Sequence, residues 1–180
     1  MVIEAHELAR AKLAFELPQR WRHVEAAANE AQRIAPAFGA DATVLVTATW
    51  LHDIGYAPEL IRTGFHPLDG ANFLQADGWL PRIVDLVATH SGGALEALAR
   101  GLRTEYAGFA DEASPTRDAL WYCDVVAGPN GQPVDEDARL AELTAQYGSG
   151  ELATRSAAKA RDELANAIRR TRQRLKTARL

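Results

Sequence analysis

Six side chains of the types that bind metal ions lie in or beside segments that are otherwise mostly apolar. Each is a histidine or an aspartate, and they occur in the order His23, His52, Asp53, His66, His90 and Asp124. Imidazole nitrogen and carboxylate oxygen form the mixed ligand set that suits Zn, Fe, Mn or Co. These residue types therefore predict the chemistry of a metal site.

The adjacent pair His52-Asp53 is the most informative part of this set. It follows residues 42–51, a segment composed only of Ala, Thr, Val, Leu and Trp. A helix with no polar face is buried. Because a buried carboxylate is unfavourable unless it is paired or bound to a metal, the pair predicts a partner in the interior of the protein.

Each residue also has an explanation that requires no metal. A single histidine on an apolar helix face, such as His23 or His90, is more often a hydrogen-bonded core residue than a ligand. Asp124 could pair with a buried arginine, and His66, which precedes a proline, could cap a helix. These explanations require a separate buried partner for each residue, whereas one metal centre satisfies all six.

Length and composition are those of a soluble globular chain. The 180 residues, of which 47% are hydrophobic, fit one domain with a full core. No apolar run approaches the ~20 residues that cross a bilayer. The N-terminus lacks the features of a signal peptide, and Cys123 is the one cysteine. We therefore expect a cytoplasmic protein without disulfides or membrane contact.

Helical periodicity extends over the whole chain, and strand-like alternation is hard to find. Asp41 is expected to cap the N-terminus of a helix over 42–54, and Gly55 to cap its C-terminus. Residues 128–133 form an expected loop. The expected helices are 4–15, 18–35, 42–54, 66–78, 81–90, 94–110 with breaks at its glycines, 115–127, about 135–146, and 150–177.

The order of His23, His52-Asp53 and Asp124 on successive helices resembles the HD-domain superfamily of metal-dependent phosphohydrolases. The resemblance covers about residues 18–128. It implies an all-α helical bundle with a metal site in its core. We expect a single domain over 1–180, in which a helical extension at about 135–178 follows the HD core.

In that family the same four positions bind one metal ion, and the aspartate of the pair can bridge to a second. His66, in Gly-Phe-His-Pro, and His90, in Thr-His-Ser-Gly, look like the two extra histidines with which some members bind the second ion. The resemblance thus implies one or two divalent transition-metal ions, namely Fe, Mn, Zn, Co or Ni. With a single ion, His66 or His90 would instead donate a proton or contact phosphate.

The implied activity is hydrolysis of a small phosphorylated substrate, with a nucleotide as the expected one. Asp53 is the expected catalytic residue, beside a metal-bound hydroxide that attacks phosphorus. Cys123 is then not needed as a nucleophile and is expected in the core. Arg62 is the first candidate for binding substrate phosphate, ahead of Arg20 and Arg22, which flank His23.

Two other functions stay open at this point. Some HD-domain proteins hold two irons with a similar ligand set and act as oxygenases on a small substrate, so the ligands alone do not separate these chemistries. A non-catalytic nucleotide-binding or regulatory module is the third alternative. Such a module would have no need of a complete ligand set, and here all six positions are filled.

Charge is unevenly distributed along the chain. The net charge is −4, yet the residues from Gly150 onward carry nine Arg or Lys and three Asp or Glu, a local balance of +6. A basic segment can bind nucleic acid. However, Leu164, Ile168 and Leu175 share one helix face, which favours packing on the acidic body or on the second subunit of a homodimer. His6, on a polar helix, is expected to be exposed.

Overall fold

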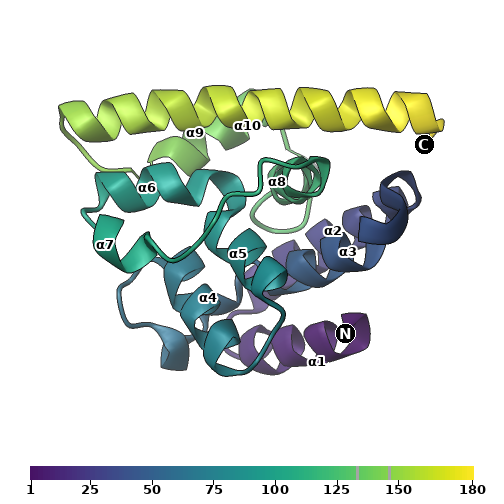
Figure 1. The fold of residues 1–180 in the computed structure, drawn as a ribbon, viewed down its shortest axis with the longest axis horizontal. Coiled ribbons are helices and arrows are strands. Elements are labelled where there is room, and N and C mark those ends of the chain that lie inside the picture. Colours follow the sequence, from purple (N-terminus) through teal and green to yellow (C-terminus); the bar gives the residue numbers. More distant parts are fainter. Residues whose placement is uncertain (133, 146) are drawn as a thin grey trace.

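The computed structural model describes residues 1–132, 134–145 and 147–180, and only the backbone of residue 136. The regular structure in these ranges is helical, with no strand, which confirms the all-α prediction (Figure 1). The α-helices are α1 (Val2–Leu13), α2 (Pro18–Ile34), α3 (Ala42–Leu51), α4 (His66–Ala76), α5 (Pro81–Thr89), α6 (Gly93–Ala99), α7 (Arg103–Tyr106), α8 (Pro115–Ala127), α9 (Glu136–Ala145) and α10 (Glu151–Ala178).

Short 3-10 helices occupy several of the connections. They are η1 (Ala35–Asp41), η2 (Ile54–Tyr56), η3 (Pro58–Leu60) and η4 (His90–Gly92). The predicted loop over 128–133 and helix over 135–146 end at Pro133 and Gln146, which lie outside the described residues.

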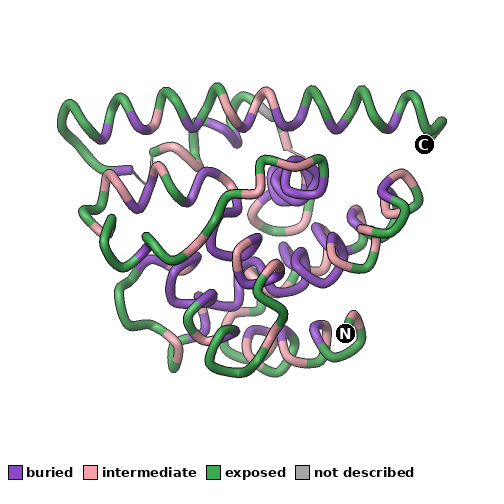
Figure 2. Tube along the Cα trace, viewed as in Figure 1, coloured by how far each residue is buried: buried purple, intermediate pink, exposed green. Residues whose placement is uncertain are grey.

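The centre of the fold is α3, which packs against α1, α2, α5 and α8. Every residue from Leu45 to Leu51 is buried, as expected for a helix without a polar face. Figure 2 shows that buried residues concentrate in these central helices, whereas α10 is buried along one side only. A polar side chain at the end of α3 therefore lies deep in the protein.

Of the two predicted caps of α3, the C-terminal one is wrong. The helix α3 ends at Leu51, and Gly55 lies beyond it in η2. Asp41 is the N-cap residue of α3, as predicted, although its carboxylate makes no capping hydrogen bond and accepts hydrogen bonds from Arg82 and Thr116. The expectation that His66 could serve as a cap is also wrong, because His66 is the first residue of α4.

One stretch, Pro18–Tyr56, reaches the length and mean hydropathy, 1.3, of a membrane span. In the structure this stretch is divided among α2, η1, α3 and η2, and Gly39 breaks its helical path with a φ of 52°. Half of its most apolar window is buried inside the protein. The core helix of a soluble protein passes the same test, so this stretch is weak evidence for a membrane span.

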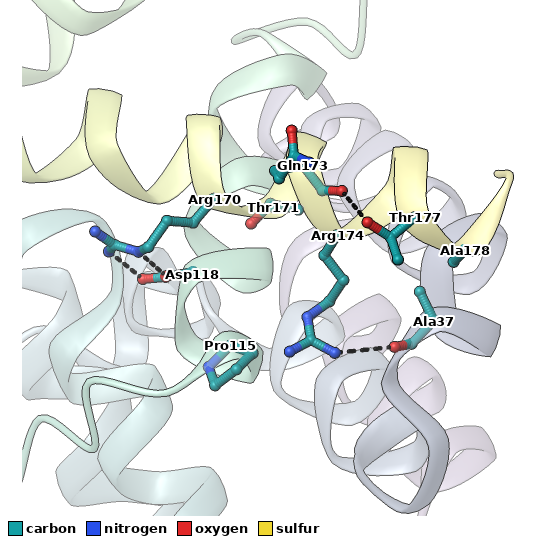
Figure 3. A pocket seen from close by; sticks show the side chains of 9 residues that line it. All are labelled: Ala37, Pro115, Asp118, Arg170, Thr171, Gln173, Arg174, Thr177 and Ala178. Carbon is teal, nitrogen blue, oxygen red and sulfur yellow. Dashed lines mark hydrogen bonds and ion pairs between the residues drawn. The ribbon is translucent and has the colours of Figure 1, made fainter.

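The basic helix α10 packs across α8 and α6 along the length of the molecule (Figure 1). Its apolar stripe, with Leu164, Ile168 and Leu175, is buried. Near its C-terminal end Arg170 donates two hydrogen bonds to Asp118, at 2.6 and 2.9 Å, and Arg174 reaches toward the carbonyl oxygen of Ala37 (Figure 3). The apolar face of α10 is thus covered by its own chain.

His6 differs from its expected surface position. Its side chain is 34% exposed, and its ring lies 4.7 Å from the ring of Trp50 and 5.7 Å from that of Trp21. His6 therefore packs α1 against the indole rings of α2 and α3, rather than standing free in solvent.

Candidate metal centre

The six predicted ligand residues come together in the interior of the helical bundle. Five are buried, and the side chain of His66 is 16% exposed. They are supplied by α2, the C-terminal end of α3, the first turn of α4, the end of α5, and α8. In that order they are His23, the pair His52 and Asp53, His66, His90, and Asp124.

A first group of ligand atoms surrounds one oxygen of Asp53. Its Oδ2 lies 3.4 Å from the Nε2 atoms of both His23 and His52, and these two nitrogens are 3.2 Å apart. The Oδ1 atom of Asp124 is 3.2 Å from His23 Nε2 and 3.9 Å from His52 Nε2. The second imidazole and both carboxylates thus lie around the Nε2 atom of His23.

A second group surrounds the other oxygen of the same carboxylate. Asp53 Oδ1 lies 3.3 Å from His66 Nε2 and 3.8 Å from His90 Nε2, and the two nitrogens are 3.1 Å apart. The ligand atoms of this group, like those of His23, His52 and Asp53, all lie within 4.8 Å of one another. Asp53 therefore belongs to both groups and offers a different oxygen to each.

Backbone carbonyl groups orient three of the four histidines. In each case the ring Nδ1 lies 2.6–2.7 Å from a carbonyl oxygen, so Nδ1 carries the proton and donates it. This leaves Nε2 unprotonated and directed at the carboxylates, the arrangement that fixes metal-binding imidazoles in proteins. The pairs are His23 with Gly128, His52 with Thr49, and His90 with Val87.

The fourth histidine, His66, is held by stacking. Its ring lies parallel to that of Tyr56, with centroids 4.0 Å apart and an interplanar angle of 18°. Tyr56 in turn lies beneath the guanidinium group of Arg20, which is 4.0 Å from the ring centroid.

The chemistry of these donors fits a metal ion. His23 and His52 both use Nδ1 as the donor, so their Nε2 atoms face each other as lone pairs at 3.2 Å. Two lone pairs at this distance repel unless a proton or a cation lies between them. A metal ion bound by these nitrogens and the ionised carboxylates would remove this repulsion.

Burial favours the neutral imidazoles that bind metals. Desolvation lowers the pKa values of His52, His66 and His90. For His23 burial also acts to lower the pKa, but the adjacent carboxylates of Asp124 and Asp53 outweigh it and raise the pKa. Since imidazole must be neutral to bind a metal, three of the four histidines are already in the binding form at neutral pH.

The two carboxylates are ionised in spite of their burial. Desolvation acts to raise the pKa of Asp53, but the positive charge of Arg20 outweighs it and holds the pKa well below its usual range. The pKa of Asp124 is likewise well below its usual range, because the contact with His23 and the positive charge of Arg139 outweigh burial. Anionic carboxylates and neutral imidazoles together form a strong ligand set for a divalent cation.

Among the arginines, the structure places Arg20 rather than Arg62 at the cluster. Arg20 Nη1 donates to Asp53 Oδ2 at 2.8 Å. Arg62 is exposed, and its Nη1 donates to the carbonyl oxygen of Ile61. Arg20 precedes His23 by three residues, which places both on one face of α2. This spacing is the sequence signal that favours Arg20 over Arg62 as the arginine beside the cluster.

Two further residues at the cluster had no signal in the sequence. Ser91 follows the ligand His90, has a φ of 47°, and donates its hydroxyl to Asp124 Oδ2. Arg139, on α9, has only 4% of its side chain exposed, and its Nη2 lies 3.6 Å from Asp124 Oδ1. Cys123 is buried, its thiol pKa is raised well above its usual value by burial, and it does not line the cavity beside the cluster.

That cavity has a volume of about 60 Å³, and Arg20, Tyr56, Ser91 and Arg139 are among its lining residues. A larger groove of about 520 Å³ adjoins it, and the two share the side chains of Arg20 and Tyr56. Figure 3 shows a hollow between α8 and α10, which has a volume of about 460 Å³. It shares no lining residue with the cavity or the groove.

Comparison with known protein families gives one match. The model of the family described as HD domain matches residues 20–144, which is more than half of the chain. The match includes all six residues of the cluster and continues beyond the predicted core, through most of α9. No curated protein and no solved structure matches the chain.

Proposed function

The chain belongs to the HD-domain family, and from this premise we propose that it is a metal-dependent phosphohydrolase acting on the phosphate ester of a small molecule. The main support is the position of Asp53, whose carboxylate lies between two groups of ligand atoms. Its two oxygens face different pairs of histidines, at 3.3–3.8 Å. Such a site can hold two ions that share one carboxylate.

Hydrolysis of a phosphate ester requires an activated water and relief of the negative charge on phosphorus oxygens. Metal ions held by the cluster would supply both, since a bound ion lowers the pKa of a water toward about 7 and attracts phosphate oxygens. His23, His52 and Asp124 would hold one ion, and His66 and His90 the other, with Asp53 shared between them.

The residues around these ligands support the same reaction. Arg20 holds Asp53 in its ionised form and lines the cavity, where its guanidinium can also donate to phosphate oxygens. Ser91 fixes the orientation of Asp124. Neither residue needs to act as a nucleophile, because the attacking oxygen is that of water.

The adjoining groove supports a small organic substrate. Its volume of about 520 Å³ falls within the range of about 300–1,000 Å³ that is typical of small-molecule sites. The ring of Tyr56 and the side chains of Leu17, Pro18 and Pro129 provide apolar surface, and Gln19 and Asn130 provide hydrogen-bonding groups. A nucleoside has this combination of flat rings and polar edges, so a nucleotide is the substrate class that we propose.

The test combines metal analysis with a substrate panel. Wild-type protein purified without added metal is expected to contain a divalent transition metal and to release phosphate from nucleotides or simple phosphomonoesters. His52→Ala with Asp53→Ala should abolish both metal content and activity, whereas His6→Ala, outside the cluster, should retain both. Full activity in the double variant would refute the proposal, as would substrate-coupled oxygen uptake without phosphate release from any ester.

A further inference from the structure

Arg139 is a charged side chain buried over the cluster with part of its hydrogen-bonding capacity unused. It is 4% exposed, and its Nε has no hydrogen-bond partner among the described residues. Nη1 lies 3.0 Å from Glu142, one turn further along α9, and Nη2 lies 3.6 Å from Asp124 Oδ1. Burial of an arginine with an unpaired donor is unfavourable, which indicates that a further partner belongs beside it.

The position of Arg139 shows what kind of partner fits. Its side chain lines the small cavity together with Arg20, Asp53 and Asp124. Arg20 approaches from α2 and Arg139 from α9, so two guanidinium groups border the same space as the ligand carboxylates. Guanidinium groups bind carboxylate and phosphate oxygens through paired N–H donors, so an anion is the group that would satisfy Nε.

The size of the cavity limits how much of a substrate can enter it. Its volume of about 60 Å³ has room for a few water molecules, at roughly 10–15 Å³ each, but is well below that of a typical small-molecule site. Glu142 and Leu143 of α9 line the wall of the cavity beside Arg139. The larger groove adjoins the wall that Arg20 and Tyr56 form. One substituent of a phosphate group can therefore extend into the groove, and α9 closes the opposite direction.

From these observations we propose that Arg139 binds the non-bridging oxygens of a terminal phosphate group and thereby selects phosphomonoesters over diesters. This inference rests on the proposed function and adds a substrate class to it. The phosphate lies between Arg20 and Arg139, and its single ester substituent occupies the groove. In a diester the second substituent meets α9. The helix α9 is thus part of the binding site and supplies its second cation.

The test measures anion binding separately from catalysis. Inorganic phosphate is titrated calorimetrically into wild-type protein carrying its own metal, and into the variants Arg139→Gln and Arg139→Lys. Loss of a charged hydrogen-bonding partner should weaken phosphate binding roughly 10- to 100-fold in Arg139→Gln, with part of the affinity retained in Arg139→Lys. KM for p-nitrophenyl phosphate should rise, and metal content should stay at the wild-type value.

Two control variants distinguish phosphate binding by Arg139 from a role of Arg139 in the packing of α9. Arg161→Gln removes an arginine that joins α10 to Asp137 of α9, at 3.1 Å, and should leave phosphate affinity unchanged. Leu140→Ala weakens the packing of α9 through a buried leucine but keeps the guanidinium. If Leu140→Ala reproduced the loss of phosphate affinity, or if Arg139→Gln lost metal instead of phosphate affinity, Arg139 would have only a structural role.

Failure of this inference is distinguishable from failure of the proposed function. A wild-type protein that hydrolyses phosphomonoesters, together with an Arg139→Gln variant of unchanged KM and phosphate affinity, would overturn the inference alone. Hydrolysis of bis(p-nitrophenyl) phosphate as fast as that of p-nitrophenyl phosphate would likewise overturn the selection of monoesters. A metal-containing wild-type protein that neither binds phosphate nor hydrolyses any ester would overturn both.

Discussion

Asp53 is a buried carboxylate with four close side-chain neighbours. Oδ2 accepts a hydrogen bond from Arg20 and faces His23 and His52, while Oδ1 faces His66. The pKa of the carboxyl group stays well below its usual range because these positive and polar neighbours outweigh desolvation. At the scale of single residues, the cluster is thus prepared for a cation before any cation binds.

Asp41 allows a pH prediction at the same scale, away from the cluster. Hydrogen bonds from Arg82 and Thr116 lower its pKa to about 2, below the value of about 3.9 in an unfolded chain. The interaction therefore stabilises the fold fully above pH 4 and is lost as the pH falls toward 2. Because both side chains of the pair are about 40% exposed, Asp41→Asn should cost only about 0.5–1 kcal/mol at pH 7.

Urea unfolding of wild type and Asp41→Asn at pH 7, 5 and 3 measures this difference. It should be constant from pH 7 to 5 and smaller at pH 3. In an Arg82→Gln background the same substitution should have little effect at any of these pH values, since its main partner is absent. A difference as large at pH 3 as at pH 7 would show that the charge of Asp41 is not responsible.

The ligand residues were predictable from sequence because a polar side chain is conspicuous in an apolar segment. The groups that orient these ligands were not predictable from sequence. The partners of His23, His52 and His90 are backbone carbonyls, which every residue possesses, so only the path of the chain decides which one is used. Arg139 was missed for a related reason, because it lies on a polar helix whose distance from the cluster is set by tertiary packing.

At the scale of helices, close contact between η2 and α4 positions His66. A Cβ atom on Gly55 would lie 2.0 Å from the carbonyl oxygen of His66 and 2.5 Å from the amide nitrogen of Gly70. Gly55→Ala should therefore push the first turn of α4 away, with a loss of about 1–3 kcal/mol in unfolding free energy. Because His66 lies in that turn, the variant should also bind less metal.

Gly108→Ala is the matched control for this prediction, since a Cβ atom there meets nothing within 4 Å. Denaturant unfolding and metal analysis of both variants decide the matter. Wild-type stability and metal content in Gly55→Ala would show that α4 can shift without disturbing the site.

The same close contact explains why Gly55 was wrongly predicted as a helix cap. In the sequence, a glycine required by close contact with a neighbouring helix looks the same as a glycine that ends a helix.

At the scale of the whole molecule, the C-terminal helices are joined to the metal centre at two places. The helix α10 packs on α8, which carries Asp124, and on η4, which begins with His90. A Cβ atom on Gly92 would lie 3.3 Å from the Cβ of Ala160 in α10 and 2.9 Å from the hydroxyl of Tyr147. The match to the HD-domain family also continues through most of α9. We therefore expect the core and the C-terminal helices to unfold together.

Leu164→Ala tests this expectation, because Leu164 is fully buried in the middle of α10. The loss of buried side-chain volume should cost about 2–5 kcal/mol. If the molecule is one cooperative unit, the urea midpoint falls in a single transition with an unchanged slope, and the metal is released in that same transition. Leu152→Ala, at a position on α10 that is 47% exposed, should change stability by no more than about 0.5 kcal/mol. Two separate transitions, with metal retained after the first, would show instead that α10 is an independent appendage and that the site is complete without it.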